Sequence, residues 1–338
     1  MTSILSKWKL PSSKDQVSIF KVDRRSKLTD HDVLIRVKVA GVNPIDYRAM
    51  SGAVEVKPLP HNPGAELSGV VEKIGNHVTN IKEGDRVIVY NRVFDGTCDL
   101  CLNQSEMLCR NGGIIGVVTN GGFAEYNSVP ERNVFKIPDE MDWDLAARLP
   151  ISILTAFHAL KEGSLKVNDC LIVFGASGNT GMMALQFGKK IGARVIGVSK
   201  QHWITNFGAD YVIGDYDKVV EKVDEITEGR MADVVLNSLG VKTWDSSSVG
   251  VNGRLAAFGS LTGADVKLNI QSLYYRQIEL IGATGGNRKE LQEFLTTFSA
   301  KDLKVKVWKR FSIQDVRKAL RALTDKGREG RILLEIKS

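Results

Sequence analysis

The sequence predicts an α/β protein with two domains, one mainly β and the other built on a doubly wound parallel sheet. Short β-like runs separated by Gly, Pro and Asn dominate the chain before residue 149, whereas strand-like and helix-like segments alternate after it. A chain of 338 residues is long enough for two separate cores. We expect residues 1–148 and 300–338 to form the β-rich domain, and residues 149–299 the parallel-sheet domain.

The runs of the first domain have the length and spacing of strands in a barrel-like or partly open β structure. In chain order they are "HDVLIRVKVAGV", "LSGVVEKIG", "GDRVIVYNRV" and "FAEYNSVP". The tail adds "VKVWKRF", an amphipathic helix in "SIQDVRKALRALTDKG" and a closing strand in "GRILLEI". Because the tail again contains short β-like runs, we expect it to complete the β-rich domain.

The second domain contains strands that alternate with helices. Its strand-like segments are "CLIVFG", "ARVIGVSK", "ADYVIG", "ADVVLNSLG", "GRLAAFGS" and "QIELIGATGG". Helix-like runs between them include "QHWITNFG" and "KVVEKVDEITEG". Such alternation predicts a parallel sheet with helices on both faces.

Composition and charge favour a globular protein that binds small phosphorylated molecules. No apolar run approaches about eighteen residues, and "MTSILSKWKLPSSKDQ" lacks the apolar core of a signal peptide, so we expect a cytoplasmic location and no membrane segment. The net charge is +7, from lysines and arginines spread along the chain. This distribution suits attraction of phosphorylated cofactors or acyl thioesters better than binding of nucleic acid.

The stretch "CLIVFGASGNTG", residues 170–181, indicates a dinucleotide site. A strand precedes its glycines and a helix follows them. Gly178 and Gly181 occupy the positions where backbone approaches a pyrophosphate and where helix packs on strand, with Ser177 in the same loop. The N–H groups of Asn179, Thr180 and Gly181 are then expected to face a pyrophosphate at a helix N-terminus. The alternative is a tight turn with a packing role only.

The end of the next strand favours NADPH over NADH. An NAD site usually has Asp or Glu there, whereas this chain has Ser199 and Lys200, a hydroxyl and an ammonium that suit an extra phosphate. Tyr216, after the third strand, is expected to flank that phosphate. The alternatives are a solvated lysine at a strand end and a tyrosine that packs.

The chain resembles the medium-chain dehydrogenase/reductases over nearly its whole length. The resemblance rests on "AGVNPIDYRAMSG", "PGAELSGVVEKIGNHVTNIKEGDRVIVY", "GGFAEY", "LTAFHAL", "GASGNTG" and "GREGRILLEI", which occur in the family's order and spacing. It implies a GroES-like catalytic domain, a Rossmann domain, a cofactor cleft at their junction and a small-molecule carbonyl substrate. It also implies a homodimer or homotetramer.

Three of the four cysteines occur in "FDGTCDLCLNQSEMLC". The spacing Asp95-x2-Cys98-x2-Cys101-x7-Cys109 resembles the structural-zinc lobe of the zinc alcohol dehydrogenases, with aspartate in place of the first cysteine. Zinc accepts a carboxylate beside thiolates in a closed tetrahedral site, so we expect one structural zinc here. The alternatives are reduced thiols in a loop or a redox pair. Cys170 is expected in the core.

The same resemblance implies that the ligands of a catalytic zinc are replaced in this chain. Zinc members carry Cys in the segment that corresponds to "GVNPIDY", His directly before the Glu of "GAELSG" and Cys near "RLPISIL". This chain has Asn43, Ala65 and Pro150 or Ile151 at those places. The segment "GVNPIDY" itself resembles the quinone oxidoreductase and enoyl reductase branch, which works without catalytic metal.

Without zinc as Lewis acid, alcohols become poor substrates, whereas conjugated carbonyls accept hydride and spread the charge over an enolate. We therefore expect hydride transfer from NADPH to a quinone, enone or enoyl thioester. Asn43 and Tyr47 are expected to line the pocket, with Tyr47 as hydrogen-bond or proton donor. Alternatively Asn43 is a turn former and Tyr47 a core aromatic. A first alternative function is a zinc alcohol dehydrogenase with a rearranged metal site that includes His61 and Asp46. A second is a protein that binds the cofactor without turnover.

Family positions imply further cofactor contacts. They lie at or after strand ends of the parallel sheet, except for the first, which lies in "LTAFHAL": Thr155, Asn237, Ser238, Phe258, Gly259 and Thr284. Arg331 occupies a basic position frequent in the family, and we expect it to be structural or weakly phosphate-directed.

Overall fold

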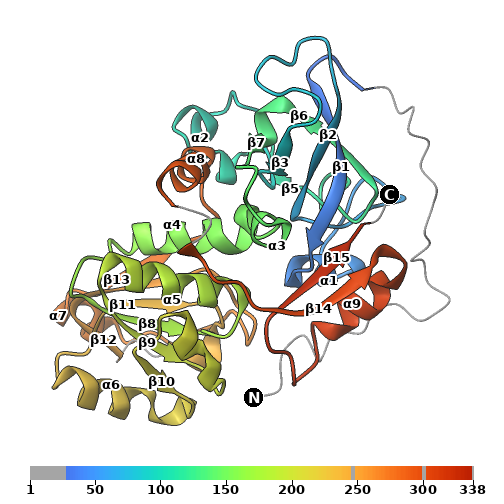
Figure 1. Cartoon of the computed structure of the whole chain (residues 1–338). Helices are drawn as coiled ribbons and strands as arrows, with labels where there is room; N and C mark the ends of the chain where they lie inside the picture. Colours follow the sequence, from blue (N-terminus) through green and yellow to red (C-terminus); the bar gives the residue numbers. More distant parts are fainter. Residues whose placement is uncertain (1–27, 245–247, 299–301, 337–338) are drawn as a thin grey trace. The chain divides into compact units, whose positions relative to one another are not determined.

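The structure is a computed structural model that describes residues 28–244, 248–298 and 302–336 (Figure 1). It divides into two compact units. The parallel-sheet unit comprises residues 152–286, and the β-rich unit comprises the described residues up to 151 together with those from 287 onward. The N-terminal segment behind the signal-peptide argument lies outside the described residues. Within these ranges, no helix combines the length and the apolar composition needed to cross a bilayer.

The parallel-sheet unit alternates strands and helices as the sequence predicts. Its strands are β8 (Cys170–Phe174), β9 (Arg194–Val198), β10 (Tyr211–Ile213), β11 (Ala232–Asn237), β12 (Val249–Ala257) and β13 (Glu279–Gly282). Its helices are α4 (Leu154–Glu162), α5 (Asn179–Ile191), α6 (Val219–Thr227) and α7 (Ile270–Tyr275). The segment "QHWITNFG" forms a 3-10 helix, His202–Phe207, rather than a full α-helix, and ends at Gly208 with φ of 99°.

The strands of this unit lie in the order β10-β9-β8-β11-β12-β13 and are all parallel. Crossovers between parallel strands are right-handed. Because α5 leads from β8 to β9 and α6 leads from β10 back to β11, the two helices cover opposite faces of the sheet. The predicted doubly wound, Rossmann-type sheet is therefore confirmed, and its order reverses between β8 and β11, where such sheets bind ligands.

The β-rich unit is organised around one sheet. Its strands are β1 (Asp32–Gly41), β2 (Leu67–Ile74), β3 (Arg86–Val89), β4 (Arg92–Val93), β5 (Gly113–Ile114), β6 (Tyr126–Pro130), β7 (Val134–Lys136), β14 (Val307–Ser312) and β15 (Arg331–Glu335). Its helices are α1 (Pro44–Met50), α2 (Asp99–Leu102), α3 (Trp143–Ala146), α8 (Arg288–Thr297) and α9 (Val316–Ala322). A π-helical segment, Leu149–Ile153, contains the boundary between the units.

The tail completes this sheet. The strand order is β14-β15-β1-β2-β3-β7, β6 also pairs with β1, and β4 pairs with β5 in a small separate sheet. β15 runs antiparallel to β1, with Gly41 opposite Leu333. Side chains of β1 alternate between buried and half-exposed over most of its length, as a strand with one core-facing side requires. The mainly-β, GroES-like architecture is as the sequence predicts.

The second boundary differs from the predicted residue 299, because α8 clusters with the β-rich unit. The side-chain amide of Asn287 donates to the carbonyl oxygen of Gln104 at 2.9 Å, and the N–H of Arg288 donates to Glu106 Oε1 at 2.5 Å. Both acceptors lie in the cysteine-containing segment, far away in sequence. This packing partner of α8 was not visible in the sequence.

The close packing of α5 on β8 gives a stability prediction. A Cβ on Gly181 would lie 2.3 Å from the carbonyl oxygen of Gly175. Because this neighbour is backbone, the loop must move, and we expect Gly181→Ala to lower the free energy of unfolding by about 1–3 kcal/mol. Gly214→Ala is the matched control, since its nearest neighbour would lie at 3.7 Å. Urea denaturation of the full chain measures both, and equal stability would contradict the packing argument.

Candidate functional site

The loop between β8 and α5 presents backbone donors at the reversal point of the parallel sheet. Gly175 has φ of 71°, which favours glycine, and the N–H of Gly178 donates to its carbonyl oxygen at 2.8 Å. The first hydrogen bond of α5 runs from Met182 N–H to the Gly178 carbonyl. Among the described residues, nothing accepts from the N–H groups of Asn179, Thr180 and Gly181. N–H groups without acceptors at a helix N-terminus can bind an anion such as pyrophosphate, and Ser177 lies in the same half-exposed loop.

The carboxyl end of β9 holds the residues expected to select NADPH. Ser199 is 2% exposed and its hydroxyl oxygen accepts the N–H of Gln201 at 3.1 Å. Lys200 is exposed. The hydroxyl of Tyr216 donates to the Val198 carbonyl at 3.4 Å, and burial raises its pKa. Lys200 is therefore the exposed charge at this strand end, while Ser199 and Tyr216 shape the backbone beside it.

Next to these residues lies a cavity of about 330 Å³ that the sequence analysis did not find. It is lined by Phe174, Tyr216, Asp217, Val219, Lys242, Thr243 and Trp244. The indole N–H of Trp244 is buried and has no hydrogen-bond partner in the described part of the chain. A cavity with aromatic walls and an unsatisfied donor suits a purine base. The sequence did not indicate this cavity, because the fold brings the loop after β11, with Lys242, Thr243 and Trp244, next to the other lining residues.

Asn237 and Ser238 bind the protein's own loops. The Asn237 side-chain oxygen accepts the N–H groups of Leu239 and Gly240 at 2.9 and 3.0 Å, and its amide donates to the Thr243 carbonyl at 3.0 Å. The Ser238 hydroxyl donates to the Phe174 carbonyl at 3.2 Å. The Ser238 bond ties the end of β11 to the end of β8, and the Asn237 bonds hold the loop that follows β11. The two residues thus build the edge at which a cofactor would bind.

The remaining predicted cofactor residues follow the same sheet edge, apart from one on α4. Phe258 and Gly259 follow β12, and Thr284 follows β13 and is exposed. A Cβ on Gly259 would lie 2.3 Å from the Ser238 carbonyl oxygen, so this residue must be small. Thr155 lies in the first turn of α4 and is half-buried.

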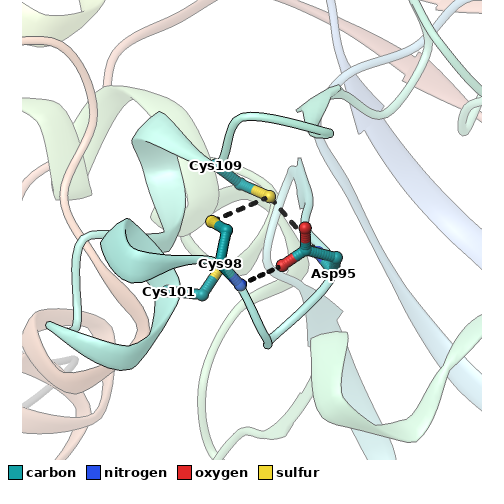
Figure 2. A group of neighbouring side chains, drawn as sticks. All are labelled: Asp95, Cys98, Cys101 and Cys109. Atoms are coloured by element: carbon teal, nitrogen blue, oxygen red, sulfur yellow. Dashed lines mark hydrogen bonds between the residues drawn. The ribbon is translucent and has the colours of Figure 1, made fainter.

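The four predicted zinc ligands converge in the β-rich unit (Figure 2). The ligand atoms of Asp95, Cys98, Cys101 and Cys109 all lie within 4.8 Å of one another, and the cysteines are free thiols. Cys98 lies at the N-terminus of α2, whose turn brings Cys101 to the same side. Three sulfur atoms and one carboxylate oxygen at this spacing fit Zn²⁺ in a closed tetrahedral site.

Hydrogen bonds hold the aspartate in place of the missing cysteine. Asp95 Oδ1 accepts the N–H groups of Thr97 and Cys98 at 2.8 and 3.0 Å, and Oδ2 accepts the Asn111 amide at 2.7 Å. The N–H of Cys98 is the largest cause that lowers the pKa of Asp95, so the carboxylate is ionised. The pKa of Cys101 is raised to about 12 by desolvation, and a bound cation would oppose this shift.

A buried polar network occupies the region expected to have lost a catalytic zinc. The Asn43 amide donates to Glu66 Oε2 at 3.0 Å, and its oxygen accepts from Arg331 at 2.8 Å. Arg331 also forms an ion pair with Glu66, and both side chains are fully buried. Glu66 Oε1 accepts the N–H of Ile151 at 3.1 Å, and the N–H of Ala65 donates to Asp46 at 2.9 Å. The three replaced positions therefore meet around Asp46 and Glu66.

The residues considered for a rearranged metal site are bonded to different backbone groups. Asp46 accepts the N–H groups of Asn43, Gly64 and Ala65, and burial raises its pKa to about 6. His61 Nε2 lies 2.8 Å from the Gly116 carbonyl oxygen instead. In the described ranges, the Asp95 cluster is the only group of three or more His, Cys, Asp or Glu side chains placed to hold a metal.

Tyr47, the second predicted catalytic residue, lies on α1 and is 2% exposed. Burial raises the pKa of its hydroxyl, so Tyr47 is protonated at neutral pH. It can donate a hydrogen bond.

Comparisons with known proteins agree with this arrangement. The family model of the alcohol dehydrogenase GroES-like domain matches residues 29–139, and that of the zinc-binding dehydrogenases matches residues 180–300. The NAD-dependent alcohol dehydrogenase of Sulfolobus acidocaldarius is 31% identical over 323 residues, which cover 90% of this chain and 92% of that protein. The quinone oxidoreductase of Homo sapiens is 26% identical, covering 80% of this chain and 77% of its own.

A solved structure is similar over the same extent. The thermostable alcohol dehydrogenase from Pyrobaculum aerophilum aligns with a TM-score of 0.84 and 39% identity, over 91% of this chain and 92% of that one. From the two family models and these similarities, the protein belongs to the medium-chain dehydrogenase/reductase superfamily as an oxidoreductase of the zinc-binding alcohol dehydrogenase type.

Proposed function

We propose that the protein is an NADPH-dependent reductase of conjugated carbonyls, namely quinones, enones or enoyl thioesters, and that its zinc is structural. The observation that carries this proposal is the chemistry of the three replaced ligand positions. Asn43 brings an amide already bound to Glu66 and Arg331, Ala65 brings a methyl group, and Ile151 brings an alkyl chain. Amide, methyl and alkyl groups do not replace thiolate and imidazole as zinc ligands.

The reaction type follows from this donor set. Reduction of a simple aldehyde builds charge on one oxygen, which a Lewis acid usually stabilises. Hydride addition to a conjugated carbonyl spreads the charge, and a hydrogen-bond donor can stabilise the enolate. When bound, the reduced nicotinamide supplies the hydride. The likeness to quinone oxidoreductase supports this reading, whereas the likeness to NAD-dependent alcohol dehydrogenases favours alcohol–aldehyde interconversion as the second candidate.

Tyr47 is proposed as the donor to the developing oxyanion. Its burial keeps the hydroxyl protonated, which is the form that can donate. Asn43 is the N-cap residue of the same helix, α1, and its N–H donates to Asp46. Its side chain is bound to Glu66 and Arg331. We propose that Asn43 positions the helix and thereby the tyrosine.

The edge strand β13 is proposed as the surface through which a homodimer forms, with a tetramer as the alternative assembly. β13 is last in the strand order, and nearby α7 exposes Ile270, Tyr274 and Tyr275. A free strand edge beside apolar side chains is a template for pairing with another chain. Sedimentation velocity tests the assembly, since a monomer would contradict it.

The substrate proposal predicts zinc-independent turnover of conjugated acceptors. NADPH oxidation is followed with a quinone, an enone, an enoyl thioester and a simple aldehyde, each with and without added Zn²⁺. We expect at least about tenfold higher kcat/KM for one conjugated acceptor than for the aldehyde, unchanged by added metal. Activity confined to the aldehyde and dependent on zinc would establish the second candidate instead. NADPH binding without turnover of any acceptor would indicate a cofactor-binding protein.

Lys200 is expected to recognise the 2′-phosphate of NADPH. Lys200→Ala should weaken NADPH binding about tenfold and leave NADH binding unchanged, since only NADPH carries the extra phosphate. Lys166→Ala removes another exposed lysine of the same unit and serves as the control. Fluorescence titration of reduced cofactor gives both affinities. An equal loss of affinity for NADPH and NADH would show that Lys200 attracts both cofactors and does not recognise the 2′-phosphate.

Zinc in the Asp95 cluster is expected to stabilise the first turn of α8. Gln104 and Glu106 bind the start of α8. Both residues lie in sequence between the predicted ligands Cys101 and Cys109. Cys101→Ser should lower zinc from about one ion per chain and speed amide exchange in residues 288–292. Cys170→Ala, in the core of the other unit, is the control and should change neither. Elemental analysis and hydrogen exchange measure the two effects. Slow exchange in a zinc-free variant would show that the helix is held independently.

A further inference from the structure

A second cavity lies entirely within the β-rich unit, and none of the activities proposed above uses it. Its volume is about 470 Å³, in the range of small-molecule sites. Its walls come from the cysteine-containing segment, from β7 and from the first turn of α8. The lining residues are Phe94, Gly96, Cys101, Gln104, Glu106, Phe135, Arg288, Lys289 and Gln292. Figure 1 shows α2 and α8 beside this region.

The guanidinium of Arg288 is the feature that points to a ligand. Its central carbon lies 5.7 Å from the ring centres of both Phe94 and Phe135. Its Nε is buried and has no hydrogen-bond partner, and no carboxylate pairs with it in the ranges that the structure describes. A buried N–H without a partner costs free energy, and a guanidinium in this state favours an incoming acceptor.

Arg132 contacts the same aromatic ring, but its guanidinium donors are bonded to the protein. Its guanidinium carbon lies 4.7 Å from the ring centre of Phe94, on the ring that Arg288 also contacts. However, its nitrogens donate to the carbonyl oxygens of Asp95 and Phe94 at 3.1 and 2.6 Å. Arg132 is therefore committed to the protein, whereas Arg288 keeps its donors.

The other charges around the cavity leave an excess of positive charge. Lys289 is exposed and lines the cavity, so the cavity has two cationic side chains. Glu106 is buried and accepts the N–H of Arg288, which satisfies the helix end. The Asn287 side chain caps the first turn of α8 by accepting the N–H of Glu290. An anion in the cavity would thus be bound by the side chains of Arg288 and Lys289, not by the backbone of α8.

We propose that this cavity binds a small aromatic carboxylate. The planar fork of Arg288 matches the two oxygens of a carboxylate, and Lys289 adds a second charge. The rings of Phe94 and Phe135 provide the apolar wall on which a flat ligand can pack. Cys101 and Gln104 line the same cavity and belong to the zinc-ligand segment.

Benzoate is the probe, and isothermal titration calorimetry of the full chain at about 0.1 M salt is the measurement. We expect saturable binding of benzoate to one site, and binding of benzyl alcohol, its neutral analogue, at least about tenfold weaker. Arg288→Leu keeps the apolar contacts with the rings and the backbone bond to Glu106, and should weaken benzoate about tenfold. Lys318→Leu removes one exposed charge from α9 and is the matched control, with unchanged affinity expected.

Three results would overturn the proposal: equal benzoate affinity of Arg288→Leu and the unchanged protein, benzyl alcohol binding as tightly as benzoate, or no binding of benzoate up to about 10 mM. If Arg288→Leu does not fold, Arg288→Lys keeps the charge without the planar fork and should weaken benzoate at least about threefold. Because NADPH is absent from the titration, the result does not depend on the proposed reductase activity.

Discussion

The buried ion pair between Glu66 and Arg331 is the interaction on which the β-rich unit depends. The two residues are 265 positions apart, and their contact links the start of β15 to the residue before β2, across β1. Removing charges from water costs several kcal/mol per ion, so such a pair persists only with additional hydrogen bonds. Asn43 and the N–H of Ile151 supply these bonds to the carboxylate. Loss of one partner would leave an uncompensated buried charge, which typically costs about 3–5 kcal/mol.

The same network links structure to the proposed chemistry. Asn43 is proposed to occupy the position of a zinc ligand in the related zinc enzymes, and its amide connects Glu66 to Arg331. A side chain that satisfies a buried ion pair is held rigidly and is not available as a ligand. Helix α1, which Asn43 caps, carries Tyr47. Stability of the sheet and placement of the proposed donor thus rest on one set of hydrogen bonds.

The two units build their sites by different means. The proposed nucleotide-binding edge of the parallel sheet depends on backbone: a left-handed Gly175, a close approach at Gly181 and the N–H groups that begin α5. The metal cluster depends on side chains brought together by one short segment, in which hydrogen bonds from Thr97, Cys98 and Asn111 hold the carboxylate of Asp95.

The sequence by itself determined what is local. The order of strands and helices, the glycine loop at residues 175–181 and the cluster from Asp95 to Cys109 follow from short-range spacing, because turns, helix starts and metal-ligand loops are set within a few residues. The four side chains predicted to bind zinc lie close enough together to share one metal ion. Only the helix type of "QHWITNFG" differed among these local features, since its six residues close as a 3-10 helix.

Only the tertiary structure decided what depends on distant contacts. It placed α8 with the β-rich unit through Gln104 and Glu106, turned Asn237 and Ser238 toward the protein's own loops, and joined Glu66 to Arg331. It also formed the two cavities, one beside Trp244 and one beside Arg288. No periodicity or spacing in the sequence records such partners, because most of these contacts join segments that are far apart along the chain and that only the fold brings together.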